Sequence, residues 1–93
     1  MKKWSMNNLI FLPEAWSDYV FWQKENKNVL RRINLILRDI ARDAFHGIGK
    51  PEPLRGNLTG WWSRRIDTAN RLVYRIRENG DIEIAECRGH YTA

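Results

Sequence analysis

Apolar residues in the first part of the chain follow two different spacings. A mostly apolar run at positions 8–12 stops at Pro13, which is typical of a short buried strand. Pro13 also suits the first turn of a helix, and Glu14 adds an acidic side chain there. The pattern then predicts a helix over residues 13–25, in which three apolar side chains share one face: Trp16, Tyr19 and Val20.

A second and more regular helix is predicted over residues 29–44. Its apolar residues recur at the i, i+3, i+4, i+7 spacing, and they are Val29, Ile33, Ile36, Leu37, Ile40 and Ala44. Its charged residues lie mostly on the other side, so we expect this helix to pack on a flat surface. Asn26 and Asn28 both have a side chain that favours the N-cap position.

The second half of the chain has the pattern of strands. Glycine and proline interrupt residues 47–60, which predicts an irregular loop. Strands are predicted at residues 61–66, 71–77 and 82–88, and Asn79-Gly80 is a strong signal for a tight turn between the last two. With 93 residues, the chain is expected to form one α+β domain over residues 1–93. Two N-terminal helices would pack on one face of a largely antiparallel sheet of four to five strands.

A two-residue turn at Asn79-Gly80 would also fix which residues share a face of the sheet. The face that receives the helices would carry the pairs Leu72–Cys87, Tyr74–Ala85 and Ile76–Glu83. The opposite face, here called the open face, would carry Arg71–Arg88, Val73–Glu86 and Arg75–Ile84. If the last strand runs straight to residue 90, Arg71, Arg88 and His90 gather at one end of the open face. Two alternative lengths of the loop before residue 71 leave open whether Arg64 or Arg65 joins Arg71.

Charge points to a polyanionic partner. The formal net charge is +5, and segment 50–77 alone carries seven basic residues against two acidic ones. Most of these cations are arginines, whose planar guanidinium groups suit phosphate recognition, so RNA binding is favoured over a merely solvated basic surface. The single cysteine and the absence of an apolar run of transmembrane length predict a cytoplasmic protein that binds no membrane.

The candidate chemistry is RNA cleavage without a metal or another cofactor. His46, His90 and Cys87 have no zinc-binding spacing, and Cys87 is predicted to lie in the core. Cleavage at a ribose 2′-hydroxyl needs a base, an acid and cations around the phosphate. Glu52, held between two prolines, is the candidate base, and His90 is the candidate acid. The alternatives are an exposed loop carboxylate and a histidine near a chain end.

Several blocks of this sequence resemble one family. They are Lys50-Pro51-Glu52-Pro53-Leu54, residues 57–66 (NLTGWWSRRI), residues 71–74 (RLVY), and Cys87-Arg88-Gly89-His90-Tyr91. Residues 16–19 and 22–23 fit the first helix of the same family. The chain resembles the YoeB toxins of the RelE superfamily over about residues 8–91.

The resemblance implies a microbial-ribonuclease-like fold and the toxin role in a type II toxin–antitoxin module. Such toxins cut mRNA in the ribosomal A site without a metal, which inhibits translation. A YefM-like antitoxin, whose acidic segment would cover the active site, is the implied partner beside the ribosome and mRNA, and members of the family frequently form homodimers. A non-catalytic RNA- or ribosome-binding module and a protein-binding domain that accepts an acidic peptide are the alternatives.

The resemblance also implies roles for individual residues, which are matched by their positions in the family's motifs. Glu52 matches the general base, His90 the general acid, Arg71 the arginine at the transition-state phosphate, and Tyr91 a tyrosine that orients the substrate. The expected phosphate-binding residues are Lys50, Arg55, Arg65 and Arg88. The chain departs from the family pattern by about six additional N-terminal residues and by Thr92-Ala93 after the His-Tyr pair.

Overall fold

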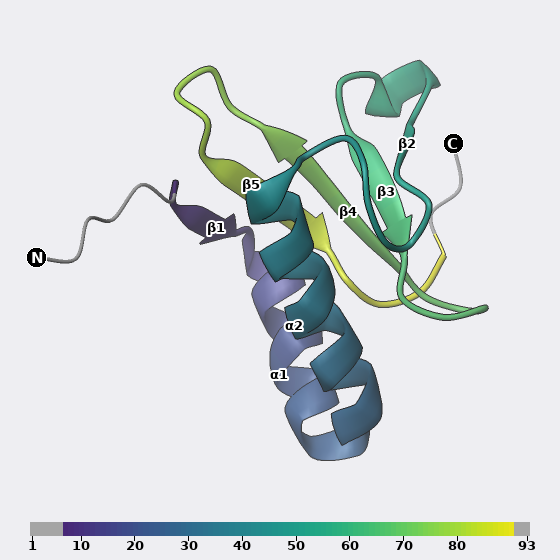
Figure 1. Ribbon diagram of the computed structural model, residues 1–93. Helices are drawn as coiled ribbons and strands as arrows, with labels where there is room; N and C mark the ends of the chain where they lie inside the picture. The colour runs from purple at the N-terminus through teal and green to yellow at the C-terminus, as the bar shows by residue number, and fades with distance from the viewer. Residues whose placement is uncertain (1–6, 91–93) are drawn as a thin grey trace, which may run out of the picture.

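The computed structural model of the chain describes residues 7–90, which form a layer of helices on a layer of strands. Helices α1 (Pro13–Glu25) and α2 (Lys27–Arg42) lie next to each other against one face of the sheet (Figure 1). The strands are β1 (Leu9–Phe11), β2 (Glu52–Pro53), β3 (Trp62–Arg65), β4 (Arg71–Ile76) and β5 (Ile82–Glu86). Their order is β1-β5-β4-β3-β2, and only the β1–β5 pair is parallel. The predicted α+β fold is confirmed.

The predicted irregular loop contains more regular structure than its glycines and prolines indicate. Strand β2 forms at its Pro-Glu-Pro segment, and a short 3₁₀ helix, η1, covers Gly56–Leu58. Neither α1 nor α2 combines the length and the apolar character that a membrane crossing requires, and these are the helices of the described part of the chain.

Both helices begin at the residues that favour a helix start. Pro13 is the first residue of α1, and Glu14 lies in its first turn. Of the two candidate caps for α2, Asn26 is the one used: its Oδ1 accepts from the N–H groups of Asn28 at 3.0 Å and Val29 at 3.2 Å. Helix α2 therefore begins and ends two residues earlier than predicted.

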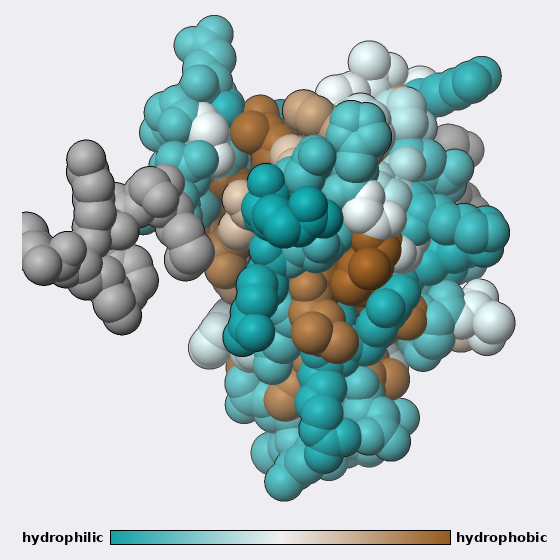
Figure 2. Space-filling view, viewed as in Figure 1, coloured by the Kyte–Doolittle hydropathy of each residue, from teal (hydrophilic) through white to brown (hydrophobic). Residues whose placement is uncertain are grey.

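The core lies between the helices and the sheet. Helix α2 contributes the predicted apolar stripe, whereas α1 buries Ala15, Asp18 and Trp22 and leaves Trp16 53% exposed. The other core residues are Ile33, Ile36, Leu37, Ile40, Ile66, Leu72, Tyr74, Ile82, Ile84 and Cys87. Hydrophilic side chains cover most of the surface seen in Figure 2, with hydrophobic patches around the C-terminal end of α2.

The β4–β5 hairpin has one more loop residue than predicted. The N–H of Arg77 donates to the carbonyl O of Asp81 at 2.8 Å, which leaves residues 78–80 as a three-residue loop. As a result, β4 and β5 pair Tyr74 with Ile84, Arg75 with Glu83, and Ile76 with Ile82. The predicted pairs Tyr74–Ala85, Ile76–Glu83 and Arg75–Ile84 are therefore wrong.

Burial explains this register. Ile82 and Ile84 are 3% and 0% exposed and belong to the core, whereas the predicted register would have turned Glu83 into the core and Ile84 away from it. Ala85 then forms a bulge that moves the pairing back by one residue, so Val73 faces Glu86 as predicted.

The register of the β3–β4 hairpin shows which of Arg64 and Arg65 shares the open face with Arg71. Arg65 pairs with Arg71, and Arg64 pairs with Leu72, which belongs to the core beneath the helices. Because side chains alternate along a strand, Arg65 shares the open face with Arg71, and Arg64 points toward the helices. Five residues, 66–70, separate the paired Arg65 and Arg71, and the Ile66 N–H donates to the carbonyl O of Asn70 at 3.0 Å within this turn.

Candidate active site and nucleic-acid interface

The open face carries a row of side chains that are aligned across four strands. Glu52 of β2 pairs with Ser63 of β3, Ser63 pairs with Val73 of β4, and Val73 pairs with Glu86 of β5. Ser63 and Val73 are buried, whereas Glu52 is exposed at the end of the row, on the edge strand β2. The predicted base therefore stands at one edge of the open face.

Two arginines of the predicted site, Arg65 and Arg71, lie in the next row of the same face. Arg65 pairs with Arg71, and both line a hollow of about 380 Å³ at the turn between β3 and β4. Arg32 of α2 also lines this hollow, and its Nη2 donates to the carbonyl O of Arg65 at 3.4 Å. The Arg71 guanidinium donates to the carbonyl O of Asp67 at 3.1 Å. Three guanidinium groups around one hollow can attract a phosphate group.

The chain after β5 turns back toward this pair of arginines. The N–H of Arg71 donates to the carbonyl O of Gly89 at 3.0 Å, and the N–H of Gly89 donates to Oδ1 of Asn70 at 2.7 Å. Figure 1 shows this segment leaving β5 and running toward the β3 side of the sheet. His90 follows directly and is exposed, so the predicted acid lies one residue from a backbone contact with Arg71. Tyr91 lies outside the described residues, as do Thr92-Ala93 and residues 1–6.

Arg88 does not lie where the sequence predicts it. Strand β5 ends at Glu86 instead of running straight to residue 90, and the Arg88 guanidinium lies 3.5 Å from the ring centroid of Phe21 in α1. This cation–π contact attaches Arg88 to the helix layer. The predicted group of Arg71, Arg88 and His90 is therefore replaced by Arg71, Arg65 and the segment that leads to His90.

The loop that carries Lys50 and Glu52 is fixed by β3. The N–H of Arg65 donates to the carbonyl O of Gly49 at 2.7 Å, and Lys50 has a φ of 53°, the only positive value for a non-glycine residue in the range 7–90. Such a conformation costs an L-amino acid about 1–2 kcal/mol, and residues held in it often mark functional sites.

Buried Arg64 holds the same loop from the helix side, a role that the sequence did not predict. Its guanidinium donates to Oδ2 of Asp39 at 2.6 Å and to Oη of Tyr74 at 3.1 Å. It also donates to three loop carbonyls, those of Asp43, His46 and Ile48. The double-arginine block is the only signal in the sequence, and it does not say which arginine is buried.

These contacts divide the basic residues of segment 50–77 into two groups. Arg64 forms an ion pair with Asp39, and Arg75 and Arg77 both pair with Glu83. Lys50, Arg55, Arg65 and Arg71 take part in none of the ion pairs found among residues 7–90. The predicted phosphate-binding surface is therefore smaller than the total charge of the segment indicates.

Cys87 lies in the core, as predicted. Burial, more than any other cause, raises the pKa of its thiol to about 12, so the nucleophilic thiolate is scarce at neutral pH. In the described range, no group of three or more His, Cys, Asp or Glu residues has an arrangement that could hold a metal ion.

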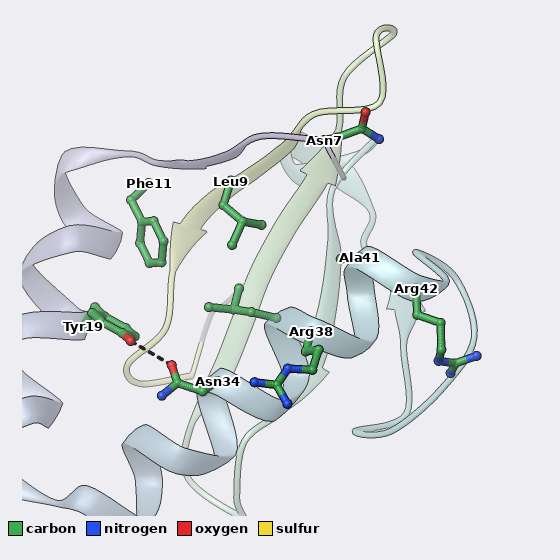
Figure 3. Close-up of a pocket in the computed structure, with 9 residues that line it drawn as sticks. Asn7, Leu9, Phe11, Tyr19, Asn34, Arg38, Ala41 and Arg42 are labelled. Carbon is green, nitrogen blue, oxygen red and sulfur yellow. Dashed lines mark hydrogen bonds between the residues drawn. The ribbon is translucent and has the colours of Figure 1, made fainter. Parts of the chain in front are cut away.

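A second hollow lies on the helix side of the sheet, away from the open face (Figure 3). It measures about 620 Å³ and is lined mainly by apolar side chains, among them Leu9, Phe11 and Leu37. Arg38 and Arg42 of α2 lie at its rim, and Oη of Tyr19 donates to Oδ1 of Asn34 at 2.7 Å across one end. This groove is separate from Glu52, Arg65 and Arg71.

Comparison with known proteins gives a consistent result. The family model described as the YoeB-like toxin of bacterial type II toxin-antitoxin systems matches residues 11–91. A relative from Synechocystis sp., Toxin YoeB, is 52% identical over 83 residues, which are 89% of this chain and 95% of the relative. Two solved structures from Staphylococcus aureus each cover 94% of this chain and 100% of their own. They are a YoeB dimer (TM-score 0.86, 44% identity) and a YoeB–YefM complex (TM-score 0.84, 46% identity).

These similarities extend over nearly the whole chain, and they include the segments that build the open face. The chain therefore belongs to the family of YoeB-like toxins of bacterial type II toxin–antitoxin systems.

Proposed function

We propose that this toxin is a ribosome-dependent endoribonuclease that cleaves mRNA in the ribosomal A site and so inhibits translation. The observation that supports the proposal is that Glu52, Arg65 and Arg71 share one face of the sheet, and that the chain bonds to Arg71 directly before His90. Glu52 lies at the edge of this face, Arg65 and Arg71 are paired in the next row, and Gly89 makes the bond to Arg71. A base, cations and an acid are the groups that cleavage at a ribose 2′-hydroxyl needs.

In the proposed reaction, Glu52 takes the proton of the ribose 2′-hydroxyl, and the 2′-oxygen attacks the adjacent phosphorus. The bond from phosphorus to the 5′-oxygen breaks, and His90 gives its proton to that oxygen. The products are a 2′,3′-cyclic phosphate and a 5′-hydroxyl. Because protein groups handle both protons, the chemical step needs no metal.

The basic residues have two proposed roles. Arg71 stabilises the charge that develops on the phosphate, and Arg65 assists it from the opposite strand. Lys50 and Arg55 hold the neighbouring phosphates of the RNA. Tyr91 orients the substrate, as its place after His90 in the family motif implies.

The same surface is the proposed target of the antitoxin. The S. aureus relative forms a complex with YefM, so we expect a YefM-like partner in the cytoplasm whose acidic segment covers the open face. An acidic peptide would compete with RNA for Lys50, Arg55, Arg65 and Arg71. A homodimer, as in the S. aureus YoeB structure, is the second expected assembly.

The test is single-turnover cleavage of mRNA on ribosomes, with the 5′ ends of the products mapped. Glu52→Gln and His90→Gln should each lower the cleavage rate by about 10²–10⁴-fold, the usual contribution of a general base or acid. Arg71→Ala should lower it to a similar extent. All three should bind ribosomes nearly as well as the wild type, since binding is spread over many cations.

Arg38→Ala is the control. Arg38 lies in α2, at the rim of the groove on the helix side of the sheet, so this variant should cleave at the wild-type rate. Wild-type rates for both Glu52→Gln and His90→Gln would overturn the acid–base assignment. Ribosome binding without cleavage would favour the alternative, a non-catalytic ribosome-binding module that uses the same face.

A further inference from the structure

Side chains of α1 hold both polar backbone atoms of Cys87. The N–H of Cys87 donates to Oδ2 of Asp18 at 3.0 Å, and its carbonyl O accepts from Nε1 of Trp22 at 2.9 Å. Asp18 and Trp22 are four residues apart, so they project from the same face of the helix. All three residues are buried, with exposed fractions of 6% for Asp18, 8% for Trp22 and 0% for Cys87.

These contacts attach α1 to the segment after β5 through polar groups. Burial, chiefly, raises the pKa of Asp18, which shows that the carboxylate is held in a place unfavourable for its charge. Apolar side chains of similar volume would attach α1 to β5 without that penalty. Apolar contacts tolerate small shifts, whereas two hydrogen bonds to one peptide backbone do not. The polar pair therefore specifies the position of residue 87 along the helix.

That position controls the segment that follows. At residue 88, the guanidinium of Arg88 stacks on Phe21 of the same helix. At residue 89, the chain bonds to Arg71 at the start of β4 and to Asn70 in the turn before it. Strand β5 has already ended at Glu86, so these contacts take the place of the sheet ladder in guiding the chain to His90.

We infer that Asp18 and Trp22 are positioning residues for the proposed cleavage. By fixing the backbone of Cys87, they determine where residues 88–90 leave the sheet, and hence where the His90 imidazole stands relative to Arg71. The inference rests on the proposed function, since that function makes His90 the acid. Helix α1, which contributes no side chain to the open face, would thus position the His90 imidazole for the reaction.

The experiment compares Trp22→Phe with Trp16→Phe. The first substitution removes the Nε1–H donor and keeps an aromatic ring, and the second makes the same change at an exposed tryptophan of the same helix. Trp22→Phe should lower the single-turnover rate on ribosomes about tenfold at unchanged ribosome affinity. It should also speed hydrogen exchange of the Cys87 and Gly89 amides about tenfold. Trp16→Phe should change neither quantity.

A pH profile separates positioning from general loosening of the fold. A general acid works only in its protonated form, so the wild-type rate should fall at high pH. In Trp22→Phe this fall should be shallower, because a displaced imidazole contributes less to the rate. A global loss of stability would lower the rate at every pH and would leave the shape of the profile unchanged.

Asp18 provides a second pair of variants that does not depend on an aromatic substitution. Asp18→Asn keeps an oxygen acceptor for the Cys87 N–H and should retain a rate near that of the wild type, whereas Asp18→Ala should lose about tenfold. Thermal unfolding of every variant confirms that the folded form is assayed.

Wild-type cleavage together with wild-type Gly89 amide exchange in both Trp22→Phe and Asp18→Ala would overturn the inference. Failure of the proposed function would look different. In that case the wild type itself would not cleave on ribosomes, while Trp22→Phe would still speed Gly89 exchange.

Discussion

Arg64 donates hydrogen bonds to five acceptors from a fully buried position, and two of these acceptors are the side chains of Asp39 and Tyr74. Asp39 also bonds to the exposed Arg42 and to the N–H of Ile48. The carboxylate thus joins α2 to the loop that leads to Glu52. Removal of its charge would leave a buried guanidinium without a counter-ion.

Asp39→Asn should therefore lower the free energy of unfolding by about 3 kcal/mol, the usual cost of breaking a buried ion pair from one side. Chemical denaturation at neutral pH measures this quantity. Arg42→Ala is the control, because it removes the exposed partner of the same carboxylate and should lower the free energy of unfolding much less. Equal losses in the two variants would contradict the role given to Arg64.

The same carboxylate should make the fold sensitive to acid. Hydrogen bonds from Arg42 first, and then from Ile48 and Arg64, lower the pKa of Asp39 from 3.8 to about 2. A carboxyl with a lowered pKa contributes its stability above its unfolded-state pKa and loses it as the pH falls through the folded-state value. The free energy of unfolding should thus decline between pH 3.8 and about 2. In Asp39→Asn, denaturation curves over this range should show a weaker decline.

Single residues also show how far the sequence could predict the site. Glu52, Arg71 and His90 follow from the type of chemistry and from the family motif. The sequence does not show which of Arg64 and Arg65 lies on the open face. That depends on the length of the loop between β3 and β4, and a change of one residue in this length exchanges the two faces. The place of Arg88 depends on where β5 stops and on Phe21, a contact between distant parts of the chain.

At the scale of elements, the β4–β5 hairpin depends on Gly80. Its φ is 92°, and its N–H donates to the carbonyl O of Arg77 at 2.8 Å. A Cβ at this position would lie 2.6 Å from Nδ2 of Asn7, a side chain that can move. Gly80→Ala should lower the free energy of unfolding by about 1 kcal/mol, mainly through the left-handed backbone.

Gly80→Asn should cost less than Gly80→Ala in the same denaturation experiment, because asparagine enters the left-handed region more readily. A smaller loss for alanine than for asparagine would show that contact with Asn7, and not the backbone conformation, governs this turn.

The hairpin also shows why sequence patterns identify elements better than registers. Asn79-Gly80 correctly predicts a turn between two strands, and the apolar spacing correctly predicts α2. The two-residue loop is wrong because burial of Ile82 and Ile84 favours a three-residue loop, and the bulge at Ala85 then restores the expected pair of Val73 and Glu86. Local turn preference and core burial compete here, and burial decides.

For the molecule as a whole, the net charge of +5 does not measure the surface that is proposed to bind RNA. Arg77 is paired with Glu83, whereas Arg55 is in none of the ion pairs within residues 7–90. Arg55→Ala should therefore reduce the slope of log K against log salt concentration for ribosome binding by about 1. Titrations at several salt concentrations measure this slope.

Arg77→Ala is the matched comparison, since it removes the same charge from the same segment. It should reduce the slope less, because the Glu83 carboxylate, which Arg77 shares with Arg75, already offsets part of this charge in the free protein. An equal reduction of the slope in both variants would show that total charge, and not the exposed group of cations, governs binding.

The order of the strands has a consequence for how the protein is made. Strand β5 lies between β1 and β4, and the bond from the Asn8 N–H to Asp81 joins positions 73 residues apart. Until residue 86 has emerged from the ribosome during synthesis, β1 has no neighbour, β4 is paired only with β3, and the segment that leads to His90 has not yet followed. Folding of such long-range pairs is slow compared with folding of local ones. The nascent chain therefore lacks the proposed site until β5 has been made and has paired with β1 and β4.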